Sequence, residues 1–137
     1  MKVDGGCHCG QFTYEAEVDP DQVMLCHCTD CQTLTGSAFR VVVGIDEADF
    51  KLLSGELKTY VKTAESGRLR AQTFCPECGT AIYAADAVPG DGPNFVGLRI
   101  ATARQRNSLP PKRHVWHRSA QPWITALDGL EVVETQP

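Results

Sequence analysis

The heptapeptide "FCPECGT" (residues 74–80) places Cys75 and Cys78 in a C-x-x-C turn that is followed by glycine. Such a turn brings two thiolates to one tetrahedral metal ion, and its backbone N–H groups can point at the sulfurs. A pair supplies only half of a tetrahedral site. The segment "CHC" (7–9) suits the other half, because residues two positions apart in a strand face the same side. We therefore expect a closed structural zinc site that joins the N-terminal strand to the middle of the chain, with the ligands Cys7, Cys9, Cys75 and Cys78.

The other three of the seven cysteines fall within "CHCTDC" (26–31). Three thiolates leave one position of a tetrahedral zinc ion open to water or substrate, as in catalytic zinc sites. A short helix that begins at Thr29 or Asp30 and ends before Gly36 would direct its first N–H groups toward these sulfurs. We expect a second, catalytic zinc ion here, held by Cys26, Cys28 and Cys31.

Two alternatives remain open for the group of three cysteines. A histidine from a distant segment, His114 or His117, could supply a fourth ligand and close the site, or the cysteines could hold no stable metal. His8 and His27 each stand in the middle of a C-H-C segment. By strand alternation both should point away from the metals, so we expect them beside the ligands or at the surface.

The aromatic residues Trp116 and Trp123 follow the distant histidines in the chain. The simplest interpretation is that they pack against the core, and the more specific one is that they shape a pocket near the open zinc site.

Composition limits the class of protein. The chain has 137 residues, of which 42% are hydrophobic, which is typical of one globular domain with a core. No apolar run approaches the roughly 20 residues of a membrane span, and the N-terminus lacks the apolar segment of a signal peptide. We therefore expect no membrane contact and a reducing, cytoplasmic location, where cysteines hold metals more often than they form disulfides.

The charge of the chain is negative overall but uneven. The net charge of −4 argues against bulk electrostatic binding to nucleic acid. Between residues 99 and 118 the chain nevertheless has no acidic residue and six basic ones: Arg99, Arg104, Arg106, Lys112, Arg113 and Arg118. This stretch is either a solvated loop or strand edge, or a cradle for an anionic small molecule.

The hydrophobic pattern predicts strands rather than helices. Phe12, Tyr14, Ala16 and Val18 alternate with polar residues, which is typical of a half-buried strand. Further strands are predicted over 38–45, 57–62, 68–74, 80–85, 94–101 and 114–119, with one turn of helix over 46–50 and loops at 88–93 and 108–112. We expect a mainly β fold of coiled antiparallel sheets, forming a single domain over residues 1–137.

Four segments together resemble the glutathione-dependent formaldehyde-activating enzyme family, which includes the centromere protein V type of domain. They are "GGCHCGQFTYEAEV", "CHCTDCQTLTGSAF", "LLSGELKTY" and "FCPECGTAIY". The resemblance is close over residues 3–85 and looser to about residue 130. It implies zinc-bound coiled β-sheets, as in a Rab guanine-nucleotide release factor, and the same division of the cysteines into a structural group of four and a catalytic group of three.

The same resemblance implies an activity. It is that of a carbon–sulfur lyase, S-(hydroxymethyl)glutathione synthase, whose partners are a small thiol such as glutathione and an aldehyde, formaldehyde. A homo-oligomer is possible. Two other classes of function are possible. One is a non-enzymatic zinc module for a protein partner. The other is a thiol redox enzyme such as a methionine-R-sulfoxide reductase, which would need a reactive cysteine outside both groups.

Overall fold

The structure is a computed structural model that describes residues 1–137, and strands dominate it. A three-stranded sheet has the order β1-β2-β5, and a seven-stranded sheet has the order β10-β3-β4-β9-β8-β7-β6. The strands are β1 Lys2–Gly6, β2 Thr13–Glu17, β3 Val23–Cys26, β4 Arg40–Asp46, β5 Phe50–Ser54, β6 Lys58–Thr63, β7 Leu69–Phe74, β8 Ala81–Asp86, β9 Phe95–Arg99 and β10 Arg113–Val115. The prediction of a mainly β fold is confirmed.

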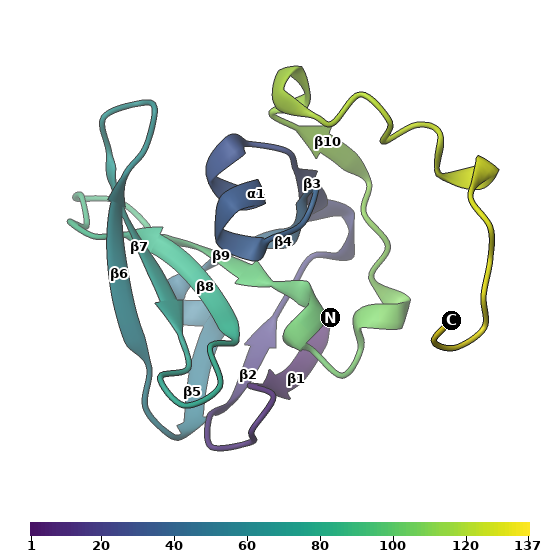
Figure 1. Cartoon of the computed structure of the whole chain (residues 1–137). Helices are drawn as coiled ribbons and strands as arrows, with labels where there is room; N and C mark the ends of the chain where they lie inside the picture. The colour runs from purple at the N-terminus through teal and green to yellow at the C-terminus, as the bar shows by residue number, and fades with distance from the viewer.

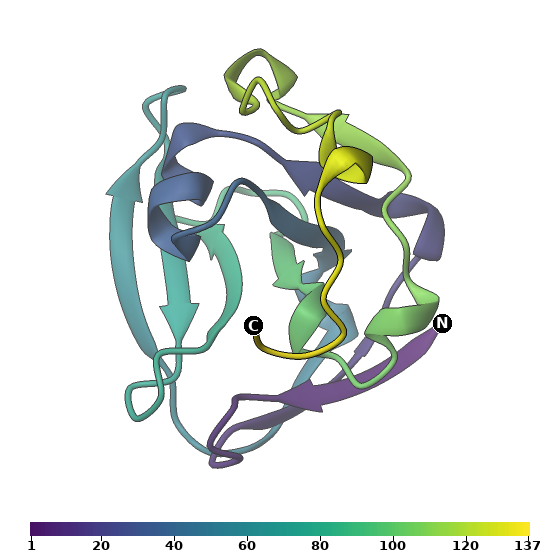
Figure 2. The ribbon, with the colours of Figure 1, turned by 45° about the vertical axis from the view of Figure 1, so that its right-hand side comes forward.

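The single α-helix, α1 (Thr29–Thr35), lies between the β6–β8 end and the β3–β10 end of the larger sheet (Figures 1 and 2). Cys28 is its N-cap, and Gly36 ends it in the left-handed conformation (φ 61°), which glycine adopts without steric cost. Both helix boundaries agree with the prediction. No helix of the structure is long and apolar enough to cross a membrane.

Short 3₁₀ helices connect the strands. They span Pro20–Gln22, Glu47–Asp49, Ile100–Thr102, Arg106–Ser108, His117–Ser119 and Leu127–Gly129. The second of these confirms the helical turn predicted over 46–50.

The core lies between the facing sides of the two sheets. Phe12, Tyr14, Ala16 and Val18 are all buried, as their alternation predicted. On the larger sheet, Val43 pairs with Leu98, and both side chains are fully buried. Because successive side chains of a strand face opposite sides, the neighbours of these core residues point to the other face, where α1 lies.

The strands of the structure differ from the predicted ones in several places. β3 and β5 were not predicted, because neither shows clear alternation between buried and exposed side chains. The segment predicted as a strand over 114–119 leaves the extended conformation after Val115 and turns into a 3₁₀ helix. Its strand, β10, pairs with β3 in parallel, whereas all the other strand pairs are antiparallel, as expected. The segment 7–9 is a turn between β1 and β2 rather than part of a strand.

Candidate metal centres and the cavity beside them

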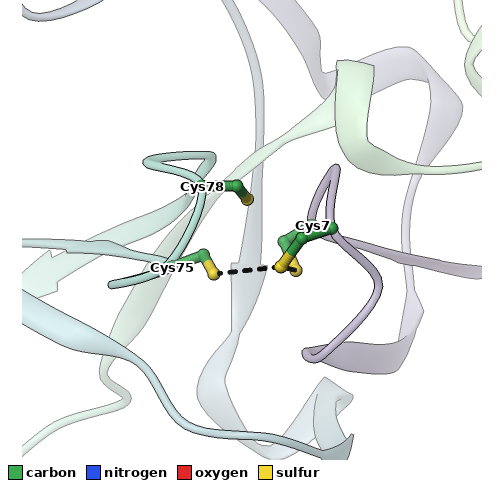
Figure 3. Close-up of side chains that lie close together, drawn as sticks. Cys7, Cys75 and Cys78 are labelled. Carbon is green, nitrogen blue, oxygen red and sulfur yellow. Dashed lines mark hydrogen bonds between the residues drawn. The ribbon is translucent and has the colours of Figure 1, made fainter.

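Two turns bring four cysteines together at one edge of the molecule. Cys7 and Cys9 lie in the β1–β2 turn, whereas Cys75 and Cys78 lie in the β7–β8 turn. All four sulfurs lie within 4.8 Å of one another, and Figure 3 shows that Cys7, Cys75 and Cys78 point into the same space. The grouping agrees with the sequence, although a turn, rather than strand alternation, places the first two ligands.

The distances between the sulfurs in this cluster fit a shared metal ion. Cys9 Sγ is 3.5 Å from Cys7 Sγ and 3.8 Å from Cys75 Sγ. Four sulfurs at 2.3 Å from a tetrahedral zinc ion stand about 3.8 Å apart, whereas a disulfide bond is about 2.05 Å long. All seven cysteines are free of disulfides. Soft thiolate donors at this spacing are consistent with zinc.

Polar groups around the four-cysteine cluster favour ionised sulfurs. The backbone N–H of Phe12 donates to Cys7 Sγ at 3.3 Å, and Gln11 Nε2 donates to Cys75 Sγ at 3.1 Å. A hydrogen bond from the Thr80 side chain lowers the pKa of Cys78 to about 5. Gln11 also accepts from the backbone N–H of Glu56 at 3.0 Å, so one side chain ties the β5–β6 loop to the cluster.

The remaining three cysteines converge where β3 meets α1. Cys26 is the last residue of β3, Cys28 caps α1, and Cys31 lies in the first turn of the helix. The three sulfurs lie within 4.8 Å of one another, with 3.6 Å between Cys26 Sγ and Cys31 Sγ. This group could also hold a metal ion, again at a spacing consistent with zinc.

The helix start and two cations stabilise negative charge on these sulfurs. The backbone N–H of Cys31 donates to Cys28 Sγ at 3.2 Å. The hydrogen bond between the Cys26 and Cys31 side chains lowers the pKa of Cys31 to about 5, and the charges of Arg40 and Arg99 act in the same direction. Burial raises the pKa of Cys28.

The histidines gather in a cluster of their own. His27 is completely buried, and its Nε2 is 2.8 Å from Nδ1 of His114. The His117 ring centroid is 5.8 Å from that of His27. The structure therefore packs His114 and His117 against His27 and does not place them with the three thiols. His27 does not join the ligands and is buried between Cys26 and Cys28 in the chain, whereas His8 is exposed.

A cavity of about 580 Å³ opens beside the three cysteines. This volume is in the range of sites for small molecules. The wall includes side chains from β6, β7, β9 and the segment after β10, together with all three cysteines: Cys26, Cys28, Cys31, Leu34, Lys62, Arg70, Gln72, Arg99, Trp116 and Ser119. The thiols of this group therefore face a space that can accept a ligand.

Two of the basic residues of the wall form ion pairs, and the third does not. Lys62 forms an ion pair with Asp30 at 2.6 Å, and Arg70 forms one with Asp86 at 2.7 Å. The hydrogen bond from Arg70 lowers the pKa of Asp86. Arg99 instead donates to the neutral side chain of Gln72 at 2.8 Å.

Of the six basic residues in the stretch 99–118, only Arg99 lines the cavity. Arg104 pairs with Asp4 at 3.2 Å and Arg118 pairs with Glu65 at 2.6 Å, so these two are neutralised by acidic side chains. Sequence reasoning missed Lys62 and Arg70, which reach the cavity from β6 and β7. These two residues could have been found only from the register of the two strands, in which Lys62 lies opposite Arg70.

Trp116 forms part of the wall, in agreement with the more specific interpretation, whereas Trp123 does not. Trp116 is the one non-glycine residue with a positive φ (φ 54°, ψ 37°). Its segment is held in place by the pairing of β10 with β3 and by Gln32 Nε2, which donates to the Ser119 carbonyl at 2.9 Å. A strained bulky residue at a cavity wall is typical of functional sites.

Comparisons with known proteins agree with this arrangement. A family model described as "Glutathione-dependent formaldehyde-activating enzyme" matches residues 2–119. Among solved structures, the chain is similar to a crystal structure of a Rhodobacter sphaeroides protein determined as a structural genomics target. The two are 19% identical with a TM-score of 0.62, and the similarity covers 82% of this chain and 99% of that one. At this identity the likeness supports the fold alone.

Proposed function

We propose, from the premise that the chain belongs to the glutathione-dependent formaldehyde-activating enzyme family, that it is a zinc-dependent carbon–sulfur lyase. Its substrate would be a thiol–aldehyde adduct such as S-(hydroxymethyl)glutathione. The observation that carries this proposal is the opening of the three-cysteine group onto a cavity of about 580 Å³. A non-enzymatic zinc module would be expected to have a closed second site, so the cavity favours the enzyme.

The two cysteine groups would have different roles. Cys7, Cys9, Cys75 and Cys78 would hold a structural zinc with a complete set of ligands. Cys26, Cys28 and Cys31 would hold the catalytic zinc, which when bound supplies a Lewis acid with one position left for a ligand. The name of the family refers to glutathione and formaldehyde, and we propose these two molecules as the partners of this protein.

The proposed reaction needs no oxidant or reductant. In the cleavage direction the carbon–sulfur bond of the adduct breaks and its electron pair goes to sulfur. The proton of the hydroxyl group passes to water or to the departing thiolate, and the carbon–oxygen bond becomes the double bond of the aldehyde. The reverse direction joins the thiol to the aldehyde. Because this addition also occurs without an enzyme, holding the two partners close together is the main task of the protein.

The cavity wall offers groups that could hold glutathione. Arg99, the basic residue of the wall without an acidic partner, presents positive charge to a carboxylate of glutathione, and charge-assisted hydrogen bonds of this kind are strong. The Trp116 ring adds an apolar surface to the wall. These residues would orient the sulfur of the substrate toward the three-cysteine group.

Exchange NMR of glutathione and formaldehyde tests this proposal, because it measures adduct formation and cleavage at equilibrium. Zinc-loaded protein should accelerate the exchange well above the rate in buffer. The Cys28→Ser variant should return the exchange to that rate. The proposal is wrong if wild-type protein leaves the exchange unchanged and calorimetry detects no binding of glutathione.

A further inference from the structure

Two buried arginines beside the three-cysteine group have no acidic partner. Arg40 is 6% exposed and Arg99 is 8% exposed. Neither takes part in any ion pair of the structure, and Nε of each lacks a hydrogen-bond partner. Arg99 donates one hydrogen bond, to the neutral Gln72 side chain at 2.8 Å. Both cations are therefore removed from water without a carboxylate to balance them.

A buried charge of this kind is costly unless an opposite charge lies near it. Arginine does not escape the cost by losing its proton. Burial, followed by the nearby charge of Arg40, lowers the pKa of Arg99 to about 9, which still leaves the guanidinium charged at neutral pH. The two arginines therefore need an anion on this face of the sheet.

Strand register places the thiols next to them. Arg40 lies directly opposite Cys26 in the β3–β4 pair. Arg99 lies opposite Val42, two residues along β4 from Arg40, so both arginines and Cys26 share one face. Side chains that are directly opposite in a sheet have Cβ atoms about 5 Å apart. The anions closest to the arginines along the sheet are thus thiolates of the three-cysteine group.

The charges of the loaded site do not balance. Three thiolates and one divalent ion together carry a single negative charge, and the two arginines carry two positive charges. The other charged residues of the wall are already paired. Lys62 pairs with Asp30, and Arg70 shares Asp86 with Arg68. The wall carboxylate Glu65 pairs with Arg118. One positive charge is left over beside the three cysteines, where Arg99 lines the cavity and Arg40 lies opposite Cys26 on the neighbouring strand.

We propose that Arg40 and Arg99 make this cavity selective for a ligand whose donor atom carries a negative charge, a thiolate rather than a neutral thiol. This inference rests on the proposed function for the identity of the thiol, but the selectivity follows from the charges beside the three cysteines. In the cleavage direction, sulfur gains negative charge as the carbon–sulfur bond breaks. Both arginines would stabilise that charge in a site with little water.

Cobalt-loaded protein allows a direct test, because ligand binding at an open cobalt site changes its visible spectrum. The probes are thiocyanate, which carries one negative charge, and imidazole, which is neutral. In the Arg40→Gln/Arg99→Gln variant, the affinity for thiocyanate should fall at least tenfold relative to the affinity for imidazole. The matched control is Arg70→Gln/Asp86→Asn, which removes a guanidinium from the same wall without changing the net charge. It should leave the ratio of affinities unchanged.

The inference is overturned if both affinities fall together, if the control loses selectivity equally, or if wild-type protein responds to neither probe. Because the double glutamine variant could lose its fold, Arg40→Lys and Arg99→Lys provide a second measurement. Each keeps the charge and should keep the selectivity, so a loss of selectivity in these variants also contradicts the inference. If the wild type selects thiocyanate through the arginines but binds no glutathione, the proposed function fails and the charge selectivity stands.

Discussion

Cys26 and Arg40 lie directly opposite each other on the antiparallel strands β3 and β4. This pairing sets a thiol of the three-cysteine group beside a buried guanidinium, on the face of the sheet that lies beside α1. A shift of the register by one residue would move Arg40 to the opposite face, toward the core. The electrostatics of the site therefore depend on the sheet as much as on the cysteine motif.

Replacing Cys28 by serine should separate its role as the cap of α1 from its role as a metal ligand. Serine is a good N-cap, so it can accept the hydrogen bond from the Cys31 N–H that Cys28 Sγ accepts at 3.2 Å. A hydroxyl is, however, a poor replacement for a thiolate that binds zinc. We expect Cys28→Ser to lose one of two zinc ions per chain, measured by elemental analysis, and to lose the thiol–aldehyde exchange.

The capping role is measured on metal-free protein. There, Cys28→Ser should unfold like the wild type, whereas Cys28→Ala should lose about 1 kcal/mol of unfolding free energy, because alanine cannot cap the helix. Equal stability of the two variants would show that the Cys28 cap contributes nothing to the helix.

Cys78→Ser should destabilise the protein far more than Cys31→Ser. The four-cysteine cluster joins the β1–β2 and β7–β8 turns, and its Cys9 and Cys75 are 66 positions apart in the sequence. An ion whose free concentration is a thousand times its Kd stabilises the folded protein by about 4 kcal/mol, and this stabilisation is lost with the ion. The three-cysteine group joins residues only five positions apart, so its ion constrains the fold less. Denaturant unfolding of the two zinc-loaded variants measures the difference, and equal losses would contradict separate structural and catalytic roles.

The strands of the fold can be predicted from the sequence where hydrophobic and polar side chains alternate. Phe12 to Val18 show the pattern clearly, and β2 is found there. β3 has only four residues with no alternation, and β5 is exposed along nearly its whole length, so neither carries a local signal. The parallel pairing of β10 with β3 depends on a partner far away in the chain, which no periodicity can indicate.

Only part of the candidate site could likewise be predicted from the sequence. The two cysteine groups follow from local spacing, because each turn or helix start positions its own ligands. Arg40, Lys62 and Arg70 reach the site through strand register, which only the folded sheet defines. His27 was expected beside the ligands or at the surface. It is buried because β10 brings His114 against its ring, at a separation of 87 residues in the chain.

Asp86 should make stability depend on pH in the acid range. The hydrogen bond from Arg70, assisted by Arg68, holds the pKa of Asp86 below its ordinary value of 3.8. A carboxyl with a lower pKa in the folded state contributes stability above the unfolded value and loses it as the pH falls through the folded value. At neutral pH, Asp86→Asn should therefore be less stable than the wild type, and the difference should shrink below about pH 4.

Urea unfolding of both proteins over this range provides the measurement. Acid also releases zinc, but it does so in both proteins, so the difference between them isolates Asp86. A difference that stays constant down to the lowest pH would contradict the ion pair.

Trp116 should affect both stability and substrate binding. A non-glycine residue at φ 54° costs about 1–2 kcal/mol, and glycine avoids this cost. We therefore expect Trp116→Gly to be about 1 kcal/mol more stable than Trp116→Ala, since both lack the ring and differ only in backbone strain. Thermal and denaturant unfolding of the two variants measure this difference.

The ring of Trp116 lines the cavity, and the Arg118 guanidinium lies 5.0 Å from its centroid. Both variants should raise KM for the adduct about tenfold with little change in kcat, because a wall contact binds substrate and transition state alike. Trp123→Ala is the matched control, since Trp123 is also exposed but lies off the cavity, and its KM should equal that of the wild type. If Trp123→Ala raises KM as much as Trp116→Ala, the effect does not come from the cavity wall. A Trp116 variant with an unchanged KM would mean that the strained conformation serves the packing of the segment after β10 and not the substrate.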